Sequence, residues 1–274
     1  MSEKELLEKA SKGDINSFQT LFINFQDQLK SYLYRLTASR AEAEDIAHDT
    51  FIKAYDKLHT FQQKSSLKTW VFQIATNIAL NEVKKRKRWT ADVSEQAKTL
   101  VLSDPKLAAS IEHINHTSDY GSYDIKEHID TCFTCISKNL AIENQVALLL
   151  KDVYDFTVQE IMSIIHKTEG QVKYFIQTAR KNMTEIFDKR CALVNKNGVC
   201  HQCSELNGWF NPKQNQEAAK IKVKMLKDTS NESKEALFEM RLQLIKAIDP
   251  LRSNGNELQE ILLKCNRMAM GEIK

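Results

Sequence analysis

Apolar residues recur along this chain at the three- and four-residue steps of an amphipathic helix. One such face consists of Phe18, Leu21, Phe22, Phe25, Leu29, Leu33 and Leu36, and a second consists of Ile46, Ala47, Phe51, Ala54 and Leu58. This spacing gathers apolar side chains on the side of a helix that turns toward a core. No stretch shows an outstanding two-residue alternation, so the pattern predicts an all-α protein.

A third helix is predicted to carry a polar stripe opposite Val71, Ile74 and Ile78. The stripe runs through Thr69, Gln73, Asn77, Asn81, Lys84 and Arg88, and five consecutive cations occupy positions 84–88. Amide groups can hydrogen-bond the edge of an unstacked base, and cations neutralise phosphates. The stripe therefore suits a single strand of nucleic acid. The alternative for the cations is a solubilising helix end, which the helix dipole favours.

Two capping boxes follow about 70 residues later. Thr157-Val158-Gln159-Glu160 and Thr168-Glu169-Gly170-Gln171 each begin a predicted helix, with His166-Lys167 and a glycine at the turn between them. The second helix turns Val172, Ile176, Ala179 and Met183 inward and polar side chains outward. This arrangement predicts a helix-turn-helix that reads duplex DNA, although a helical hairpin without DNA can look similar.

The order and spacing of these segments resemble the extracytoplasmic-function sigma factors of the sigma-seventy family. Ala43 to Leu58 matches the family's Ala-Glu-Asp motif, with His48 in place of the usual Gln, and the resemblance extends from Leu6 to about Met183. In the family this motif contacts core RNA polymerase. The resemblance therefore implies a transcription initiation factor whose partners are core polymerase, promoter DNA and, as a further candidate, an anti-sigma factor.

The resemblance also implies three sets of contact residues. Core polymerase would meet Glu44, Asp45, His48, Asp49 and Lys53. The melted minus-ten element would meet Trp70, Gln73, Asn77, Asn81, Lys84, Lys85, Arg86 and Arg88. The duplex minus-thirty-five element would meet Thr168, Gln171, Lys173, Tyr174, Gln177, Arg180 and Lys181. For Trp70 the alternative is a core residue. Tyr174-Phe175 stands where the family usually has Ser-Arg, so the alternative for Phe175 is also a core residue.

The expected organisation is two helical domains joined by a flexible linker, with a helical extension. Residues 1–90 form the core-binding and minus-ten domain, 91–127 the linker, 128–190 the helix-turn-helix domain and 191–274 the extension. The linker assignment rests on Ser103-Asp104-Pro105, scattered polar residues and Tyr120-Gly121-Ser122. Within the extension, two apolar faces around Leu237 and Leu258 predict a helical hairpin, either a packing appendage or a regulatory surface.

Cysteines bracket the predicted helix-turn-helix domain. Cys132-x2-Cys135 precedes it, and Cys191, Cys200 and Cys203 follow it. Two Cys-x2-Cys pairs have the spacing of a four-cysteine zinc site, so Cys132, Cys135, Cys200 and Cys203 are the expected ligands of a structural zinc ion, with Cys191 or His128 as substitutes. Buried thiols and a redox sensor are the alternatives. No cofactor is expected to be required.

Composition narrows the class of protein further. The chain has 274 residues, a formal net charge of +3, seven glycines and three prolines, and these favour long helices with short connections. No apolar run approaches the roughly 20 residues that span a bilayer, and a cytoplasmic protein is expected. No catalytic set is evident, so an enzyme is not expected. The rivals are a stand-alone helix-turn-helix regulator and a metal- or redox-sensing adaptor.

Overall fold

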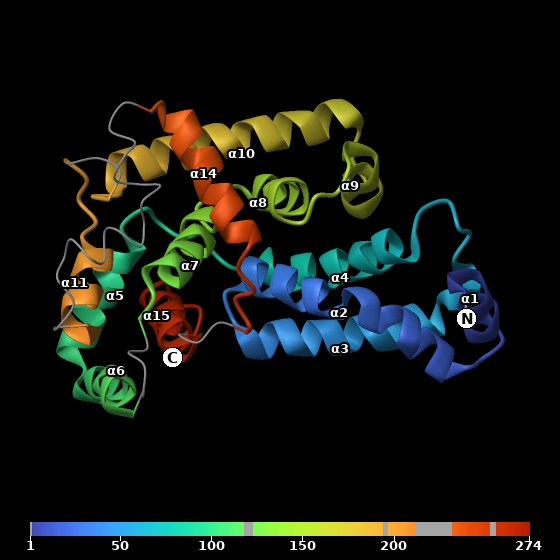
Figure 1. The fold of residues 1–274 in the computed structure, drawn as a ribbon, viewed down its shortest axis with the longest axis horizontal. Coiled ribbons are helices and arrows are strands. Elements are labelled where there is room, and N and C mark those ends of the chain that lie inside the picture. Colours follow the sequence, from blue (N-terminus) through green and yellow to red (C-terminus); the bar gives the residue numbers. More distant parts are fainter. Residues whose placement is uncertain (1, 118–122, 194–196, 212–231, 253–255) are drawn as a thin grey trace. The chain divides into compact units, whose positions relative to one another are not determined.

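The computed structural model describes residues 2–117, 123–193, 197–211, 232–252 and 256–274. Within these ranges the chain forms thirteen α-helices and no β-strand, which confirms the predicted all-α class (Figure 1). Contact clustering divides the chain into two compact units, residues 1–86 with 146–176 and residues 87–145 with 177–274. None of the described helices is long and apolar enough to cross a membrane.

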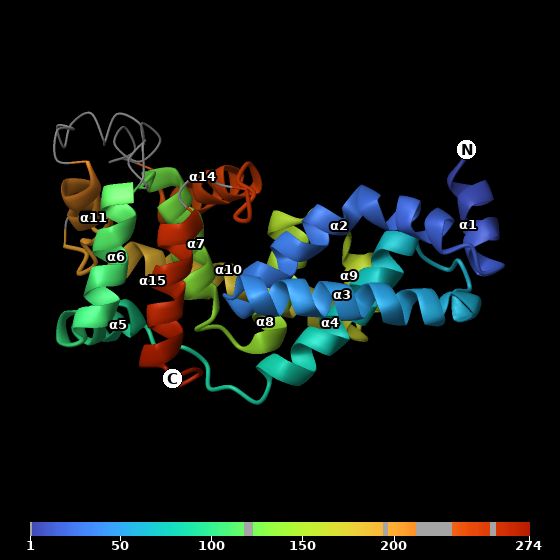
Figure 2. The same cartoon turned by 90° about the horizontal axis from the view of Figure 1, so that it is seen from below.

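The first unit is built on the helices that the apolar pattern predicts. Helices α2 (Ile15–Thr37), α3 (Arg40–Asp56) and α4 (Leu67–Val83) lie side by side in both views, with α1 (Glu3–Ser11) packed on α2 (Figures 1 and 2). Side chains of Asp14, Ser39 and Ser66 cap α2, α3 and α4, satisfying backbone N–H groups that a helix start leaves unpaired. A short 3-10 turn, η1 (Leu58–Thr60), follows α3.

The same unit includes the start of the helix-turn-helix. A π-helical turn, η2 (Leu149–Val153), continues α8 (Ile142–Leu148) and packs on α2, while α9 (Val158–Ile165) packs on α4. The buried Tyr154 hydroxyl accepts a hydrogen bond from Arg35 Nη1 at 2.6 Å. The rings of Phe72 and Phe156 lie 4.8 Å apart. Residues 146–176 therefore belong to the same compact unit as residues 1–86. The sequence had predicted them as part of a separate helix-turn-helix domain at 128–190.

The helix-turn-helix has the expected caps. Both reciprocal capping boxes form, Thr157 with Glu160 at α9 and Thr168 with Gln171 at α10 (Glu169–Arg190). The turn differs in one respect: His166, with φ of 53°, is the left-handed residue that ends α9, while Gly170 lies inside α10. The glycine expected at the turn therefore has a helical position, and a histidine takes the conformation that glycine usually supplies.

The second unit contains the segment that the sequence predicts as a flexible linker. Helices α5 (Val93–Ser103) and α6 (Pro105–Thr117) form there, and α5 packs against α15 (Asn256–Ala269). The other members are α7 (Ile125–Ser137), α11 (Gln202–Phe210) and α14 (Lys234–Lys246). Both α14 and α15 pack on α7, so the two predicted helices of the extension are present as parts of this unit's core.

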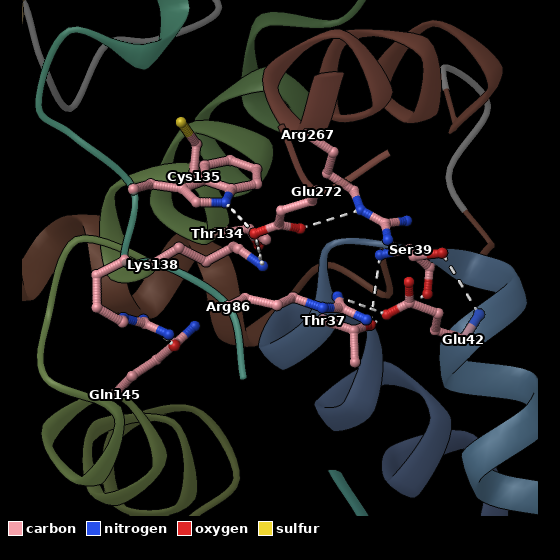
Figure 3. A network of polar contacts seen from close by, with 12 residues as sticks. Thr37, Ser39, Glu42, Arg86, Thr134, Cys135, Lys138, Gln145, Arg267 and Glu272 are labelled. Carbon is pink, nitrogen blue, oxygen red and sulfur yellow. Dashed lines mark hydrogen bonds and ion pairs between the residues drawn. The ribbon is translucent and has the colours of Figure 1, made fainter. Parts of the chain in front are cut away.

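A buried carboxylate anchors the end of the chain in the second unit. Glu272 accepts a 2.6 Å hydrogen bond from the Trp89 indole and pairs with Lys138 at 3.6 Å and Arg267 at 3.2 Å (Figure 3). The Lys138 ammonium also lies 4.6 Å from the centre of the Trp89 ring. A buried charge is tolerated only when it is paired and hydrogen-bonded, and Glu272 is both.

Candidate nucleic-acid interface

The predicted minus-ten stripe on α4 is divided into a covered and an open part. Thr69 is 1% exposed and Gln73 is half-buried, whereas Asn77 and Asn81 are exposed. The helix repeat places all four on one face, as predicted. Only the amides of Asn77 and Asn81 therefore lie open to a partner.

Helix α9 supplies the groups that engage the covered part. The Thr69 hydroxyl donates to Glu160 Oε1 at 2.9 Å, and Gln73 Nε2 donates to the Ser163 carbonyl at 3.0 Å. Gln73 Nε2 also lies 2.9 Å from the His166 ring Nε2. The donors that would recognise a base at Thr69 and Gln73 are thus already used within the first unit. The stripe was predicted from the sequence, but its α9 partners were not.

Glu160 joins the two helices because it has two tasks. Its carboxylate closes the α9 capping box by accepting from the Thr157 N–H at 2.9 Å and also accepts from Thr69. Burial alone would raise the Glu160 pKa, but the hydrogen bonds from Thr157 and Thr69 and the charge of Lys68 hold it below its ordinary value. The carboxylate is therefore ionised at neutral pH. The sequence identifies this residue as a capping glutamate but gives no signal for the contact with α4.

The cationic run does not continue the helical stripe. Helix α4 ends at Val83, so residues 84–88 lie beyond it. Lys84, Lys85 and Lys87 are exposed, and Lys85 has only a 3.7 Å ion pair with Glu82. Arg86 forms a 2.8 Å ion pair with Glu42 at the start of α3 (Figure 3). Three lysines of the run are thus exposed to solvent just beyond the end of α4.

Arg88, expected as a DNA contact, has internal partners in the second unit. Its Nε donates to the Leu140 carbonyl at 2.6 Å, and its Nη2 donates to Gln145 Oε1. Burial lowers the pKa of Arg88 to about 10, so the guanidinium is still charged at neutral pH. These contacts give Arg88 a structural role.

An aromatic pair stands at the start of α4. The Trp70 and Phe61 rings lie 5.2 Å apart, and each residue is partly exposed. The loop between them contains Gln63 in the left-handed region, with φ of 54°. Trp70 is thus neither fully buried in the core nor free. A partly exposed ring in this position can stack on a base.

Helix α3 presents the predicted polymerase face to solvent. Ala43, Ile46, Ala47, Thr50 and Ala54 are buried. The residues expected to contact polymerase are all exposed: Glu44, Asp45, His48, Asp49 and Lys53. The buried residues pack inside the unit, so the charged face is the side of α3 that a partner can reach.

Helix α10 presents the predicted duplex-reading face. Val172, Ala179 and Met183 are fully buried, whereas Ile176 and Phe175 are half-buried. The expected minus-thirty-five contacts are all exposed: Thr168, Gln171, Lys173, Tyr174, Gln177, Arg180 and Lys181. Among them, Lys173 pairs with Glu169 one turn away at 2.6 Å, and Tyr174 is 62% exposed. The inward and outward sides of α10 agree with the prediction from its spacing.

The proposed zinc ligands all lie in the second unit. Cys132, Cys135, Cys200 and Cys203 line one cavity of about 40 Å³ together with Cys191. All are free thiols. No group of three or more histidine, cysteine, aspartate or glutamate side chains within the described ranges is arranged so that it could hold a metal ion.

Comparisons with known proteins agree with the resemblance in the sequence. The family described as Sigma-70 region 2 matches residues 21–89, which span most of α2 and all of α3 and α4. The RNA polymerase sigma-H factor of Pseudomonas aeruginosa is 25% identical over 182 residues, 65% of this chain and 90% of that protein. The ECF RNA polymerase sigma factor SigW of Bacillus subtilis is 32% identical over 87 residues, and the match spans 32% of this chain and 46% of SigW.

Among solved structures, CnrH in complex with the cytosolic domain of CnrY is similar with a TM-score of 0.48. The two chains are 16% identical, and the match covers 68% of this chain and 97% of that one.

Proposed function

We propose that this chain, which belongs to the sigma-70 family of RNA polymerase sigma factors and is of the extracytoplasmic-function type, selects promoters through the residues that its helices leave exposed. As a sigma factor it directs the initiation of transcription with core polymerase and has no catalytic role of its own. The observation that carries the proposal is the coincidence of the region 2 match at 21–89 with a compact helical set that exposes charged side chains on α3 and the amides of Asn77 and Asn81 on α4.

In this proposal the exposed face of α3 docks on core polymerase. Its carboxylates Glu44, Asp45 and Asp49 stand on the side opposite the buried Ile46 and Ala47. Exposed charges contribute little to folding stability but much to complementarity with a partner of opposite charge. A basic surface on polymerase is therefore the expected counterpart.

Two exposed amides on α4 read the melted strand. Asn77 and Asn81 lie one turn apart, so they can reach neighbouring bases, and each amide offers both a donor and an acceptor. The exposed lysines at 84, 85 and 87 follow directly and suit the phosphates of the same strand. Base contacts specify the sequence, while phosphate contacts give affinity.

Full use of the stripe requires α9 to leave α4. The Gln73 amide donates to Ser163 while α9 is in place, and Thr69 is covered. A base could reach these two side chains only after the Thr69–Glu160 and Gln73–Ser163 contacts break. We infer that α9 moves away from α4 when promoter DNA is bound in the presence of polymerase.

Run-off transcription tests the proposal. The full chain with purified core polymerase should start transcription at specific sites, and core alone should not. Asn77→Ala should relax the preference for one base at one position of the minus-ten element, because the remaining contacts read other positions. A factor that binds duplex promoter DNA but never supports initiation would instead favour a stand-alone helix-turn-helix regulator.

A further inference from the structure

A cavity of about 410 Å³ lies in the second unit among α5, α6, α11 and α15. These four helices are neighbours in both views (Figures 1 and 2). Pockets that bind small organic molecules have volumes of roughly 300 to 1,000 Å³, so the cavity is large enough for such a molecule. None of the described residues that line it belongs to the predicted polymerase, minus-ten or minus-thirty-five contacts.

The wall of the cavity is mainly apolar. Five apolar side chains from the four helices form much of it: Ala97, Val101, Ile111, Leu206 and Leu262. Ile111 and Leu206 belong to a hydrophobic core of the unit, and Val101 and Leu262 pack against that core. The cavity is therefore a continuation of the core that the unit's own side chains leave unfilled.

Large apolar side chains are also exposed at this cavity. The described part of the chain exposes seven such side chains, and three of them line the cavity: Leu102 is 78% exposed, Val199 67% and Trp209 45%. Exposed apolar residues that gather at one place mark a binding site, whereas scattered single ones do not. A ligand seated there would remove these side chains from water, which is the main source of affinity for an apolar molecule.

The lysine and the two glutamates at the cavity already have partners of opposite charge. Lys98 Nζ lies 2.9 Å from both carboxylate oxygens of Glu205, and Glu95 pairs with Arg190 at 2.7 Å. Burial raises the pKa of the Cys265 thiol, so this lining group is uncharged at neutral pH. A charged ligand would have to separate one of these ion pairs or bury its own charge without a partner, and both are unfavourable. The cavity therefore suits an uncharged molecule.

Two polar side chains of the wall are placed to orient such a ligand. The Ser94 hydroxyl lies 3.8 Å from the Cys135 sulfur, and Asn266 Nδ2 donates to the same sulfur at 3.5 Å. Sulfur is a weak hydrogen-bond acceptor, so an oxygen or nitrogen of a ligand could replace it as the partner of either group. A mainly apolar wall with a few polar groups is typical of a site for a small organic molecule.

We propose that this cavity binds an uncharged, mainly apolar organic molecule between α11 and the pair formed by α5 and α15. Helices α5 and α15 pack directly against each other, whereas the Lys98–Glu205 ion pair connects α5 to α11. A bound molecule fills the space among the three helices and adds contacts that hold α11 in place. Amide hydrogen exchange in α11 should therefore become slower when the ligand binds.

A fluorescence titration of the full chain with N-phenyl-1-naphthylamine tests the site. This uncharged dye becomes brighter in an apolar environment, and a dissociation constant on the order of 10 µM is expected for a ligand of its size. The anionic dye 8-anilinonaphthalene-1-sulfonate has the same rings with an added sulfonate. It should bind more weakly by about tenfold or more, because the cavity offers its charge no partner.

Two neighbouring alanines of α6 provide matched variants. Ala108 lines the cavity and is half-buried, whereas Ala109 is exposed and is not part of the lining. Ala108→Phe should occupy part of the cavity and weaken binding of the uncharged dye by about tenfold, and Ala109→Phe should bind it like the wild type. Equal affinity in the wild type and both variants would overturn the assignment of the ligand to this cavity.

Leu102→Gln keeps the proposal testable if Ala108→Phe does not fold, because Leu102 is exposed. It should weaken binding of the uncharged dye by about threefold, whereas Ile23→Gln, which changes an exposed apolar residue of the first unit, should have no effect. A folded chain that binds neither dye, or that binds the anionic dye at least as tightly as the uncharged one, refutes the proposal. Loss of dye binding as the chain dimerises, with Leu102→Gln remaining monomeric, would assign the surface to a second copy of the chain instead.

Discussion

Replacing Thr69 by Val should loosen α9 from α4 without disturbing the rest of the first unit. Valine keeps the shape of the side chain but removes the hydroxyl, which bridges Ser66 Oγ at 2.8 Å and Glu160 Oε1 at 2.9 Å. Thr69 is 1% exposed, so water does not replace these partners while α9 stays in place. The capping box of α9 should survive, because the Thr157 contacts of Glu160 do not involve Thr69.

The expected size of the effect follows from the charge of the acceptor. A hydrogen bond to a charged group contributes about 1.5 to 3 kcal/mol, and partial exposure of Glu160 favours the lower end of this range. A loss of about 1.4 kcal/mol raises the open population roughly tenfold. Acid should act in the same direction. Because the pKa of Glu160 is lowered in the folded protein, the Thr69–Glu160 contact contributes fully at a pH above the ordinary pKa of glutamate. The contribution is lost as the pH falls through the lowered pKa of the folded state.

Hydrogen exchange measured by mass spectrometry can detect this change. Peptides that cover α9 should exchange about ten times faster in Thr69→Val, while peptides of α2 and α3 keep their protection. Asn77→Ala is the matched control, since Asn77 lies on the same face of α4 but is exposed. Equal protection of α9 in wild type and Thr69→Val would show that these hydrogen bonds do not hold α9. Equal loss of protection throughout the unit would show that α9 does not open separately.

Three further changes test the assignment of charged residues. Asp45→Lys with Asp49→Lys should weaken co-purification with core polymerase without altering helix content, because both residues are exposed. Lys84→Ala with Lys85→Ala should weaken binding to all promoters alike and reduce the salt slope by roughly 1.4, as expected for two single-strand phosphate contacts. Arg88→Met should instead destabilise the second unit by about 1.5 to 3 kcal/mol in urea unfolding, because the Leu140 carbonyl and Gln145 lose a charged donor.

Each of these changes has an outcome that would contradict it. Unaltered co-purification after reversal of Asp45 and Asp49 would remove α3 from the polymerase contact. A salt slope that stays constant would show that the lysines do not meet phosphate. Arg88→Met with wild-type stability but uniformly weak promoter binding would restore Arg88 as a DNA contact. Lys85→Ala alone should change stability by no more than about 0.5 kcal/mol, as is usual for an exposed side chain.

Periodicity and capping chemistry were enough to predict most helices. The buried face of α2 and the two capping boxes depend on residues within one or two turns of each other, so local sequence contains the information. The predicted linker shows the limit. Ser103-Asp104-Pro105 marks a break between α5 and α6, and Asp104 caps α6 by accepting from Lys106 N–H at 2.8 Å. Turn residues locate a helix boundary, but they do not distinguish a short connection from a long irregular segment.

The contacts of the candidate DNA interface depend on residues far apart in sequence. Thr69 and Glu160 are separated by 91 positions, and Gln73 and His166 by 93. The helical repeat places Thr69 and Gln73 on one polar face, yet solvent, DNA and a second helix all suit such a face. The same limit applies to Arg88, whose partners are Leu140, in the connection between α7 and α8, and Gln145, in α8. A pattern along one helix identifies a face but not its neighbour.

The cysteines illustrate how the fold changes a choice made from spacing. A Cys-x2-Cys pair places two sulfurs about one helical turn apart, which makes Cys135 equivalent to Cys132 in sequence. In the folded chain, the side chains of Asn266 and Ser94 contact the sulfur of Cys135. The turn at Gly198 brings Cys200 beside Cys191. Ligand sets are decided by which side chains remain free to turn toward a common point. Spacing along the chain therefore treats Cys132 and Cys135 alike, whereas the fold gives their sulfurs different neighbours around the same cavity.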